Sequence, residues 1–356
     1  MAQKVRVALL GYGKVAALHA EAVRASARGD LIAVCGRNAA RRDEFAVSRG
    51  LCSRETVAEA VQKDKIDAVI VSVPHPQHCE CAIAALEAGC HVLVEKPMAV
   101  NVAQCAKMIA ASEKAGKILS VVSQRRYFPP CVRVKQAIDA GKLGKPSLAQ
   151  ITILGWRDKA YYDSDPWRGK WQSEGGGVLI NQAPHQIDLM LWFMGRFQEV
   201  RGFCENINHP YIEVEDSVAA SVRFANGGLG SFFASNSQKP GIYAKAHIHG
   251  SSGGSAGVQT DGGAMFVAGM SGITEPPVND LWTIDGEQNL LAKFRAEDEA
   301  FFKKIDATTY FFTCQADDFF SAIQRGVPPS ITAEDGMETV RFIEAVYMQN
   351  GKPPDA

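Results

Sequence analysis

The sequence predicts an α/β protein with two domains, an amino-terminal doubly wound domain and a carboxyl-terminal α/β domain with an open, mostly antiparallel sheet. Three observations support this prediction. The chain has 356 residues, which is too long for one ordinary core. Continuous apolar runs alternate with helical patterns as far as about residue 122. Later apolar residues mostly alternate with polar ones, as in antiparallel strands. We therefore expect domains at residues 1–122 and 123–356.

The composition limits the kind of partner that the chain can have. Its formal net charge is −1, so nothing favours a nucleic acid or a membrane surface as a partner. The sequence has no apolar run of membrane-spanning length and no signal-peptide pattern at its start, which predicts a cytoplasmic protein. The nine scattered cysteines suit reduced thiols. The close pair Cys79 and Cys81 lacks a second pair, so we predict no metal site.

The first predicted strand, Val5–Leu10, runs directly into a glycine-rich turn that opens a helix. A G-x-G-x-x-A pattern in this position is the fingerprint of a Rossmann fold that binds a dinucleotide, because the glycines let backbone N–H groups approach the pyrophosphate. The alternative is a glycine-rich turn that binds nothing. The predicted cofactor-binding residues of this turn are Gly11, Tyr12, Gly13, Lys14, Val15 and Ala16.

The second strand, Leu31–Cys35, bears on the choice between NAD and NADP. An acidic residue that binds the ribose 2′-hydroxyl is expected at its end, but Gly36 and Arg37 stand there, and Arg41 and Arg42 follow. Arginines without a carboxylate accommodate a 2′-phosphate, so NADP is slightly favoured over NAD, with Arg37 as a predicted contact. An arginine can also stack on the adenine of NAD, so NAD stays open as the alternative.

A third buried strand, Ala68–Val73, follows predicted helices at 38–48 and 54–62 and ends in a turn rich in histidine and proline. Ligands of doubly wound sheets lie beyond the carboxyl ends of the strands, so this turn should face the cofactor. His78 opens the next helix, where its ring could either contact the cofactor or hydrogen-bond a helix end. The predicted cofactor contacts in this turn are Ser72, Val73, Pro74, His75 and His78.

Lys96 stands at the carboxyl end of the fourth strand, in the segment Cys90–Pro97. The residue before a proline takes extended backbone angles, and proline cannot continue the ladder, so the lysine amine can be aimed across a cleft. The alternative is a solvated lysine that merely ends the strand. A helix at Val102–Ala115 and a strand at Ile118–Val122 complete the predicted first domain.

The second domain is predicted to follow a polar, proline-punctuated hinge at Ser123–Pro130. Asn226-Gly227-Gly228 is the expected turn of one of its hairpins. The Gly- and Ser-rich stretch Gly250–Gly263 is predicted to be a loop. The predicted strands are Leu148–Trp156, Ser217–Phe224, Leu229–Ser235 and Ala244–His249, and amphipathic helices are predicted at Phe311–Arg325 and Glu334–Met348.

A segment of the second domain places polar side chains in register. After three glycines at 175–177, the apolar spacing predicts a helix on which Asn181 and His185 share one face, as do His185 and Asp188. An amide, an imidazole and a carboxylate are thereby brought together. The alternative is a histidine of the domain core that is satisfied by Asp188.

Taken together, these motifs resemble the Gfo/Idh/MocA family of NAD(P)-dependent oxidoreductases over essentially the whole chain. The motifs are the glycine-rich turn, the Glu-Lys-Pro sequence around Lys96, the hinge, and the glycine run that leads to His185. The resemblance implies action on sugars, polyols or their derivatives, catalysis by Lys96 with help from His185, and dimers or tetramers packed through the second domain's sheet. Many members carry aspartate where this chain has Asn181, which leaves the base work to Lys96, His185 or both.

The sequence thus predicts an NAD(P)-dependent dehydrogenase or reductase that acts on the CH–OH group of a sugar, glycoside or cyclic polyol. Such an enzyme could also open a multi-step route through a transient keto-sugar. The alternative from another class is a catalytically inactive sensor or scaffold that binds NAD(P). Further predicted cofactor contacts are Glu95, Lys96, Gln124, Trp167 and Arg168. The predicted catalytic residues are Lys96, His185 and Asn181, and the predicted substrate contacts are Lys96, Arg126, Tyr162, Asn181 and His185.

Overall fold

The computed structural model describes residues 3–242, 244–260 and 276–352 and divides the chain into two compact units. The first unit consists of Met1–Gln124 and Ala307–Val340, and the second of Arg125–Asp306 and Arg341–Ala356. Within the described ranges, no helix combines the length and the apolar character that crossing a membrane requires.

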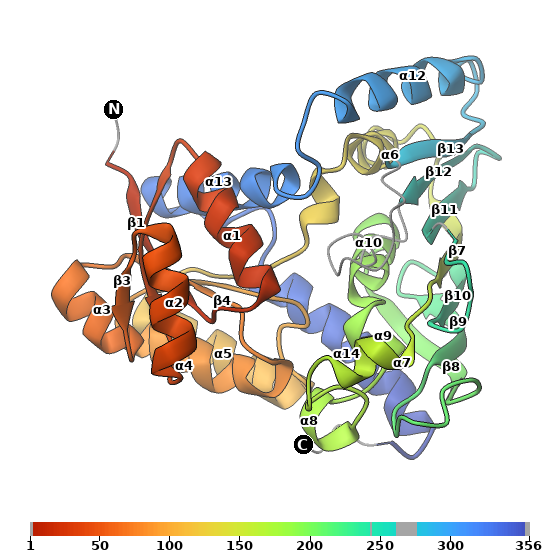
Figure 1. Cartoon of the computed structure of the whole chain (residues 1–356). Coiled ribbons are helices and arrows are strands. Elements are labelled where there is room, and N and C mark those ends of the chain that lie inside the picture. The colour runs from red at the N-terminus through yellow and green to blue at the C-terminus, as the bar shows by residue number, and fades with distance from the viewer. Residues whose placement is uncertain (1–2, 243, 261–275, 353–356) are drawn as a thin grey trace. The chain divides into compact units, whose positions relative to one another are not determined.

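The first unit is built on a parallel sheet of six strands in the order β3-β2-β1-β4-β5-β6. Strands β1, β3 and β4 of this sheet are labelled in Figure 1. The order runs outward in both directions from β1 and β4, whose junction is the point where doubly wound sheets bind their ligands. The predicted Rossmann domain is therefore confirmed. Its strands are β1 (Val5–Leu10), β2 (Gly29–Cys35), β3 (Cys52–Arg54), β4 (Ala68–Val71), β5 (His91–Val94) and β6 (Leu119–Val121). Its helices are α1 (Lys14–Ala25), α2 (Ala39–Arg49), α3 (Val57–Asp64), η1 (His75–Gln77), α4 (His78–Glu87), α5 (Val102–Ala115) and α13 (Tyr310–Arg325).

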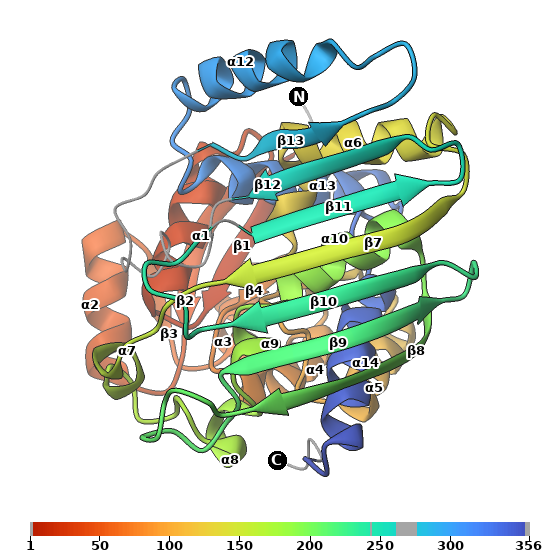
Figure 2. The ribbon, with the colours of Figure 1, turned by 90° about the vertical axis from the view of Figure 1, so that its right-hand side faces the viewer.

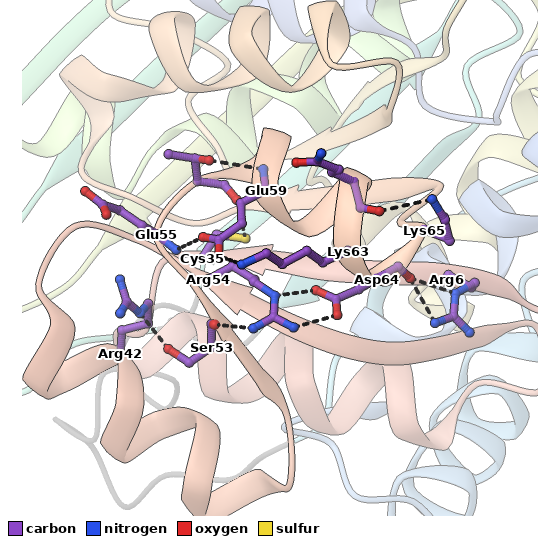
Figure 3. A network of polar contacts seen from close by, with 12 residues as sticks. Arg6, Cys35, Arg42, Ser53, Arg54, Glu55, Glu59, Lys63, Asp64 and Lys65 are labelled. Atoms are coloured by element: carbon purple, nitrogen blue, oxygen red, sulfur yellow. Dashed lines mark hydrogen bonds and ion pairs between the residues drawn. The ribbon is translucent and has the colours of Figure 1, made fainter.

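Arg54 ends the short strand β3, so the predicted helix at 54–62 begins too early. The Arg54 guanidinium forms two hydrogen bonds with the Asp64 carboxylate, at 2.7 and 2.8 Å (Figure 3). The Thr56 hydroxyl accepts the Glu59 N–H at 3.1 Å, which caps α3 and sets its start one residue later. The strand and the far end of the helix are thus tied by an ion pair that the local sequence pattern does not reveal.

Helix α13 packs in the core of the first unit, although the chain from residue 123 on was predicted to form the second domain. Its Phe312, Phe319 and Phe320 are buried among side chains of the parallel sheet and α1. Gly29 leaves room for Phe320, since a Cβ at this glycine would lie 2.5 Å from the ring. An amphipathic pattern shows that a helix has an apolar partner, but it does not show which sheet provides it.

The second unit is built on a sheet of seven strands in the order β13-β12-β11-β7-β10-β9-β8, one face of which is turned to the viewer in Figure 2. Its neighbouring strands are antiparallel except β7 and β10, which confirms the mostly antiparallel sheet. The strands are β7 (Pro146–Leu154), β8 (Phe197–Glu205), β9 (Ser217–Phe224), β10 (Leu229–Ser235), β11 (Ala244–Gly250), β12 (Ser255–Thr260) and β13 (Val278–Trp282). Its helices include η2 (Gln124–Tyr127), α6 (Pro129–Asp139), α7 (Lys159–Asp163), α8 (Trp171–Glu174), α9 (Val178–Asn181), α10 (Pro184–Met194) and α12 (Leu290–Phe302), and α14 (Ala333–Gln349) runs from the first unit into the second.

Part of the stretch Gly250–Gly263 is a strand, so the predicted loop is wrong there. Strand β12 pairs with β11, and Gly257 lies opposite His247. A Cβ at Gly257 would lie 2.4 Å from the His247 ring, so a glycine at this point lets the imidazole lie across the neighbouring strand. Residues 261–263 lie outside the described residues. Strands β8 and β13 and helices α6, α7, α8 and α12 of this unit were not predicted.

Candidate active site

The turn between β1 and α1 has the backbone geometry that a dinucleotide site requires. Gly11 has φ +118°, and a Cβ there would lie 2.5 Å from the Ser72 carbonyl oxygen, so a side chain is excluded on two grounds. Gly13 is exposed and precedes α1 as its N-cap, and a Cβ there would meet no atom within 4 Å. Open space over the amino terminus of a 12-residue helix fits a pyrophosphate, so the turn suits the predicted cofactor.

The arginines after β2 differ in how far the protein itself occupies them. Arg42 donates to the Gly36 carbonyl at 2.8 Å and to the Ser53 hydroxyl at 2.6 Å, so it holds the backbone of this turn. Arg41 is exposed, with its guanidinium carbon 5.6 Å from the centre of the Tyr12 ring. Arg37 is exposed and donates to the Gln77 side chain at 3.3 Å. Arg37 and Arg41 are therefore the arginines placed to reach a ligand phosphate.

The His78 ring lies between two backbone carbonyls where β4 and β5 end. Its ring nitrogens lie 2.7 Å from the Pro97 carbonyl oxygen and 2.9 Å from that of Val73, and the side chain is buried. Two roles were left open for this ring, a contact with the cofactor or a hydrogen bond within the protein. The structure shows the second, so contacts within the protein replace the predicted cofactor contact. Burial lowers the pKa of His78, and the neutral ring has one N–H to donate, so His78 lies between Val73 and Pro97 and donates to one of their carbonyls beside the turn that follows Lys96.

A buried histidine holds the carboxylate next to Lys96. Glu95 follows β5, and its Oε1 accepts the His19 Nε2–H at 2.8 Å, while its Oε2 accepts the Lys96 backbone N–H at 3.1 Å. Burial alone would raise the pKa of Glu95, but the hydrogen bond from His19 and the charge of Lys96 hold it below its ordinary value. An ionised Glu95 thus anchors the backbone of Lys96, and the following peptide bond to Pro97 is cis.

The predicted single helix after the glycine run is broken into two. Helix α9 ends at Asn181, and α10 begins at Pro184, whose ring removes a backbone N–H and cannot continue the preceding turn. The Ala183 N–H instead donates to the carbonyl of Val178, five residues back. Asn181 and His185 therefore belong to different helices and do not share one helical face as predicted.

Asp188 forms a buried, two-pronged ion pair with Arg126. The guanidinium Nε and Nη2 donate to the two carboxylate oxygens at 2.9 and 2.6 Å, and both side chains are almost fully buried. This pair attaches η2 to α10 within the second unit. Arg126 was predicted as a substrate contact, and Asp188 was considered only as a partner for His185, because the 62-residue separation hides the pair from sequence reasoning.

Asn181 lies in a polar cluster with two residues that were not predicted, Glu174 and Tyr161. Its Nδ2 donates to the Glu174 carboxylate and to the Tyr161 hydroxyl, the latter at 3.2 Å. Burial raises the pKa of Glu174 to about 7, although the Gly169 N–H and the Asn181 amide oppose this shift. Neither Glu174 nor Tyr161 stands in a motif, so no spacing signal could have identified them.

The remaining predicted residues of the second unit surround the same tyrosine pair. The Arg168 guanidinium carbon lies 4.4 Å from the centre of the Trp167 ring and 4.3 Å from that of Tyr161. Tyr162 is buried edge-on to the Tyr161 ring, with centres 5.1 Å apart. The second unit thus brings Tyr162, Trp167, Arg168 and Asn181 together.

The first unit gathers its predicted residues around the ends of β1, β4 and β5. Glu95 and Lys96 are among them, and Gln124 is the last residue of this part of the unit. The meeting of Lys96 with His185 stays a prediction.

Two family models match the chain. A model described as an oxidoreductase family with an NAD-binding Rossmann fold matches residues 5–123. A model of the GFO/IDH/MocA C-terminal domain matches residues 131–256. Together they include the glycine-rich turn, Lys96, Asn181 and His185.

Individual relatives agree with these models. The 1,5-anhydro-D-fructose reductase of Ensifer adhaerens is 27% identical over 89% of this chain and 87% of its own length. The scyllo-inositol 2-dehydrogenase (NAD(+)) of Bacillus subtilis strain 168 is 29% identical over 71% of this chain and 73% of its own. The WlbA dehydrogenase of Bordetella pertussis, solved with NADH and UDP-GlcNAcA, has the same fold, with a TM-score of 0.82 at 24% identity over 99% of both chains. The chain is therefore an NAD-binding oxidoreductase that belongs to the Gfo/Idh/MocA family.

Proposed function

We propose that this oxidoreductase transfers a hydride between NAD(P) and a hydroxyl or keto carbon of a sugar, glycoside or cyclic polyol. The names of the two curated relatives support the substrate class, since one reduces an anhydro-sugar and the other is a dehydrogenase of a cyclic polyol. The cofactor supplies the hydride chemistry when it is bound. The protein must therefore hold the reacting carbon in place and move the hydroxyl proton.

Lys96 is the proposed acid and base, assisted by His185, with Asn181 as a polar contact. The observation that carries this assignment is the support around Lys96. The Glu95 carboxylate binds its backbone N–H, and the His78 ring lies 2.7 Å from the carbonyl oxygen of the next residue, Pro97. A lysine that merely ends a strand needs no such support from two buried side chains. A neutral amine at this position would take the proton in oxidation, and the ammonium would return it in reduction.

Replacement of Lys96 tests this assignment. We expect Lys96→Ala to lower kcat by roughly two to four orders of magnitude, because proton transfer by a positioned group contributes about that much. The dissociation constant of the cofactor, measured by fluorescence titration, should change by less than about threefold. Lys114→Ala, at an exposed position of α5, is the matched control and should keep full activity. Near-normal turnover in Lys96→Ala would remove this residue from the chemistry.

NADP is the cofactor that we propose over NAD, with Arg37 and Arg41 as the phosphate contacts. Both guanidiniums are exposed after β2, whereas Arg42 is held by Gly36 and Ser53. The ratio of kcat/KM for the two cofactors tests this proposal. We expect Arg41→Ala to lower the ratio of NADP to NAD by about tenfold, in line with the loss of one charge-assisted hydrogen bond. An unchanged ratio would argue for adenine stacking instead.

The open face of the second unit's sheet is proposed as the surface through which copies of the chain associate (Figure 2). The strand register places four exposed apolar side chains on this face, which a monomer would leave in water. They are Leu148, Phe203, Leu229 and Phe233, with Phe203 76% exposed. Light scattering after gel filtration should give a dimer or tetramer, and Phe203→Glu should shift it toward the monomer. A monomeric wild-type chain at micromolar concentration would contradict this.

The competing function is an inactive NAD(P)-binding sensor or scaffold. A panel of sugars and polyols, tested with both cofactors in both directions, separates the two. Cofactor binding without turnover on any substrate would favour the sensor. Turnover that depends on Lys96 would exclude it.

A further inference from the structure

Arg157 is held in place by a buried polar framework. It follows β7, and its backbone N–H donates to the Asn236 carbonyl at 3.2 Å. Its carbonyl oxygen lies 2.7 Å from His209 Nε2, and the other nitrogen of that ring lies 2.6 Å from the Asp216 carboxylate. His209 and Asp216 are fully buried, so they fix the backbone from which the Arg157 side chain projects.

The Arg157 side chain is buried without a counter-ion. Only 2% of the residue is exposed, and Nη1 donates to the Trp156 carbonyl at 3.0 Å. Within the described part of the chain, the buried Nε has no hydrogen-bond partner and no carboxylate forms an ion pair with this guanidinium. Burial lowers the pKa of Arg157, opposed chiefly by the Tyr161 hydroxyl. A buried cation in this state has lost hydration that no protein anion replaces.

A second guanidinium lies against the same tyrosine. Arg157 and Arg168 have their guanidinium carbons 5.0 and 4.3 Å from the centre of the Tyr161 ring. The Tyr161 hydroxyl accepts a hydrogen bond from Arg168. Two positive charges therefore gather around one aromatic ring.

The acidic side chains nearby offset this charge only in part. Asp165 lies 3.4 Å from the Arg168 guanidinium but is 45% exposed, so solvent screens the pair. Glu174 is buried, and because burial raises its pKa to about 7, much of it is protonated at neutral pH. The cluster of Arg157, Tyr161 and Arg168 therefore keeps a net positive charge.

We propose that Arg157, with Arg168 and Tyr161, binds an oxyanion group of the substrate, so that the preferred substrates are acidic sugar derivatives. The fork of N–H donors on a guanidinium matches the oxygens of a carboxylate or a phosphate, and the anion would supply the missing counter-charge. The inference rests on the proposed function in one respect, namely that the anion is a substituent of the molecule that is oxidised or reduced.

Matched substrate pairs test the proposal with the cofactor-loaded enzyme. D-glucuronate against D-glucose tests a carboxylate, and glucose 6-phosphate against glucose tests a phosphate. We expect one acidic member to exceed its neutral partner by roughly ten- to a hundredfold in kcat/KM, mostly through KM, as expected for one charge-assisted contact. Equal or better use of both neutral members would overturn the proposal while leaving the proposed function intact.

Variants assign that preference to Arg157. In Arg157→Met the preference should fall to less than threefold, and Arg157→Lys should restore part of it. Arg201→Gln, which removes an exposed charge from β8 of the same unit, is the control and should keep the full preference. A full preference in Arg157→Met would refute the assignment. If this variant fails to fold, inhibition of the wild-type enzyme provides the test. At saturating cofactor, acetate or inorganic phosphate should compete with the acidic substrate. Absence of competition would count against the site.

Binding separates this inference from the proposed function. If no compound of the panel is turned over, quenching of tryptophan fluorescence by glucuronate and glucose 6-phosphate in the cofactor-loaded protein still reports on the site, since Trp167 packs against Arg168. Binding of an acidic sugar that is lost in Arg157→Met would support the anion site even though the hydride-transfer proposal had failed. Absence of such binding would reject the site.

Discussion

Removal of His19 should expose how strongly the first unit depends on the buried pair that it forms with Glu95. The change is His19→Leu, which keeps an apolar side chain against Phe312 but removes the Nε2–H donor. The His19 ring lies edge-on to Phe312, with ring centres 5.1 Å apart, and its hydrogen bond to the Glu95 carboxylate is 2.8 Å long. Both members of the pair are almost fully buried, so solvent cannot replace the lost donor.

The magnitude follows from the state of the carboxylate that remains. Removing the hydrogen-bond donor of a buried carboxylate costs about 3–5 kcal/mol, because the negative charge of Glu95 stays desolvated. The edge-on ring contact adds about 0.5–1.5 kcal/mol. We therefore expect His19→Leu to lower the free energy of unfolding of the first unit by about 3.5–6.5 kcal/mol. His19→Gln, whose amide N–H can take the place of Nε2–H, should cost about 1–2 kcal/mol.

A double-mutant cycle with Glu95→Gln provides the assay. Urea unfolding would be followed for the wild type, His19→Leu, Glu95→Gln and the double variant. The double variant should be more stable than the sum of the single effects predicts by at least about 1.5 kcal/mol, since it leaves no buried charge behind. Additivity within about 0.5 kcal/mol would refute the reasoning, because residues that do not interact show that behaviour.

The same pair predicts a pH dependence whose sign can be worked out. The pKa of Glu95 is lower in the folded protein than its ordinary value of 4.5, so the folded state binds this proton less readily than the unfolded state. The stability from the pair is present above about pH 4.5 and is lost as the pH falls through the folded pKa. In His19→Leu this acid-dependent loss should shrink, since the contact that lowers the pKa is gone.

Four further predictions concern the glycine-rich turn and the cluster around Asn181. Gly11→Ala should destabilise the first unit by about 2 kcal/mol or more, because φ is positive and a Cβ would meet the Ser72 carbonyl. Gly13→Ala should leave thermal stability unchanged but raise the cofactor dissociation constant, since it fills only the space over the helix amino terminus. A loss of stability as large as that of Gly11→Ala would contradict this. With a folded pKa of about 7 against an ordinary 4.5, Glu174 should make the wild type lose about 3 kcal/mol of stability as the pH rises from 4.5 to 7, and unfolding of Glu174→Gln should lack this slope. Asn181→Asp adds a carboxylate next to Glu174, and the proposed role of Asn181 predicts that it shifts the pH profile of kcat/KM; an unchanged profile would show that Asn181 does not set it.

Features that depend on neighbouring residues could be predicted from the sequence alone. The strand β1, the glycine-rich turn and helix α5 were located because apolar periodicity and turn residues act over a few positions. The same holds for Lys96, which a proline places at the end of β5. For these elements the fold confirmed what the pattern indicated.

Contacts between distant residues were decided by the tertiary structure. The pairs Arg126–Asp188 and His19–Glu95 join residues that are 62 and 76 positions apart, and no local pattern marks either partner. The break before Pro184 separated Asn181 from His185, although the apolar spacing alone suited one helix. Packing also assigned α13 to the first unit. Periodicity records that a side chain is buried, but the partner that buries it is set by the fold as a whole.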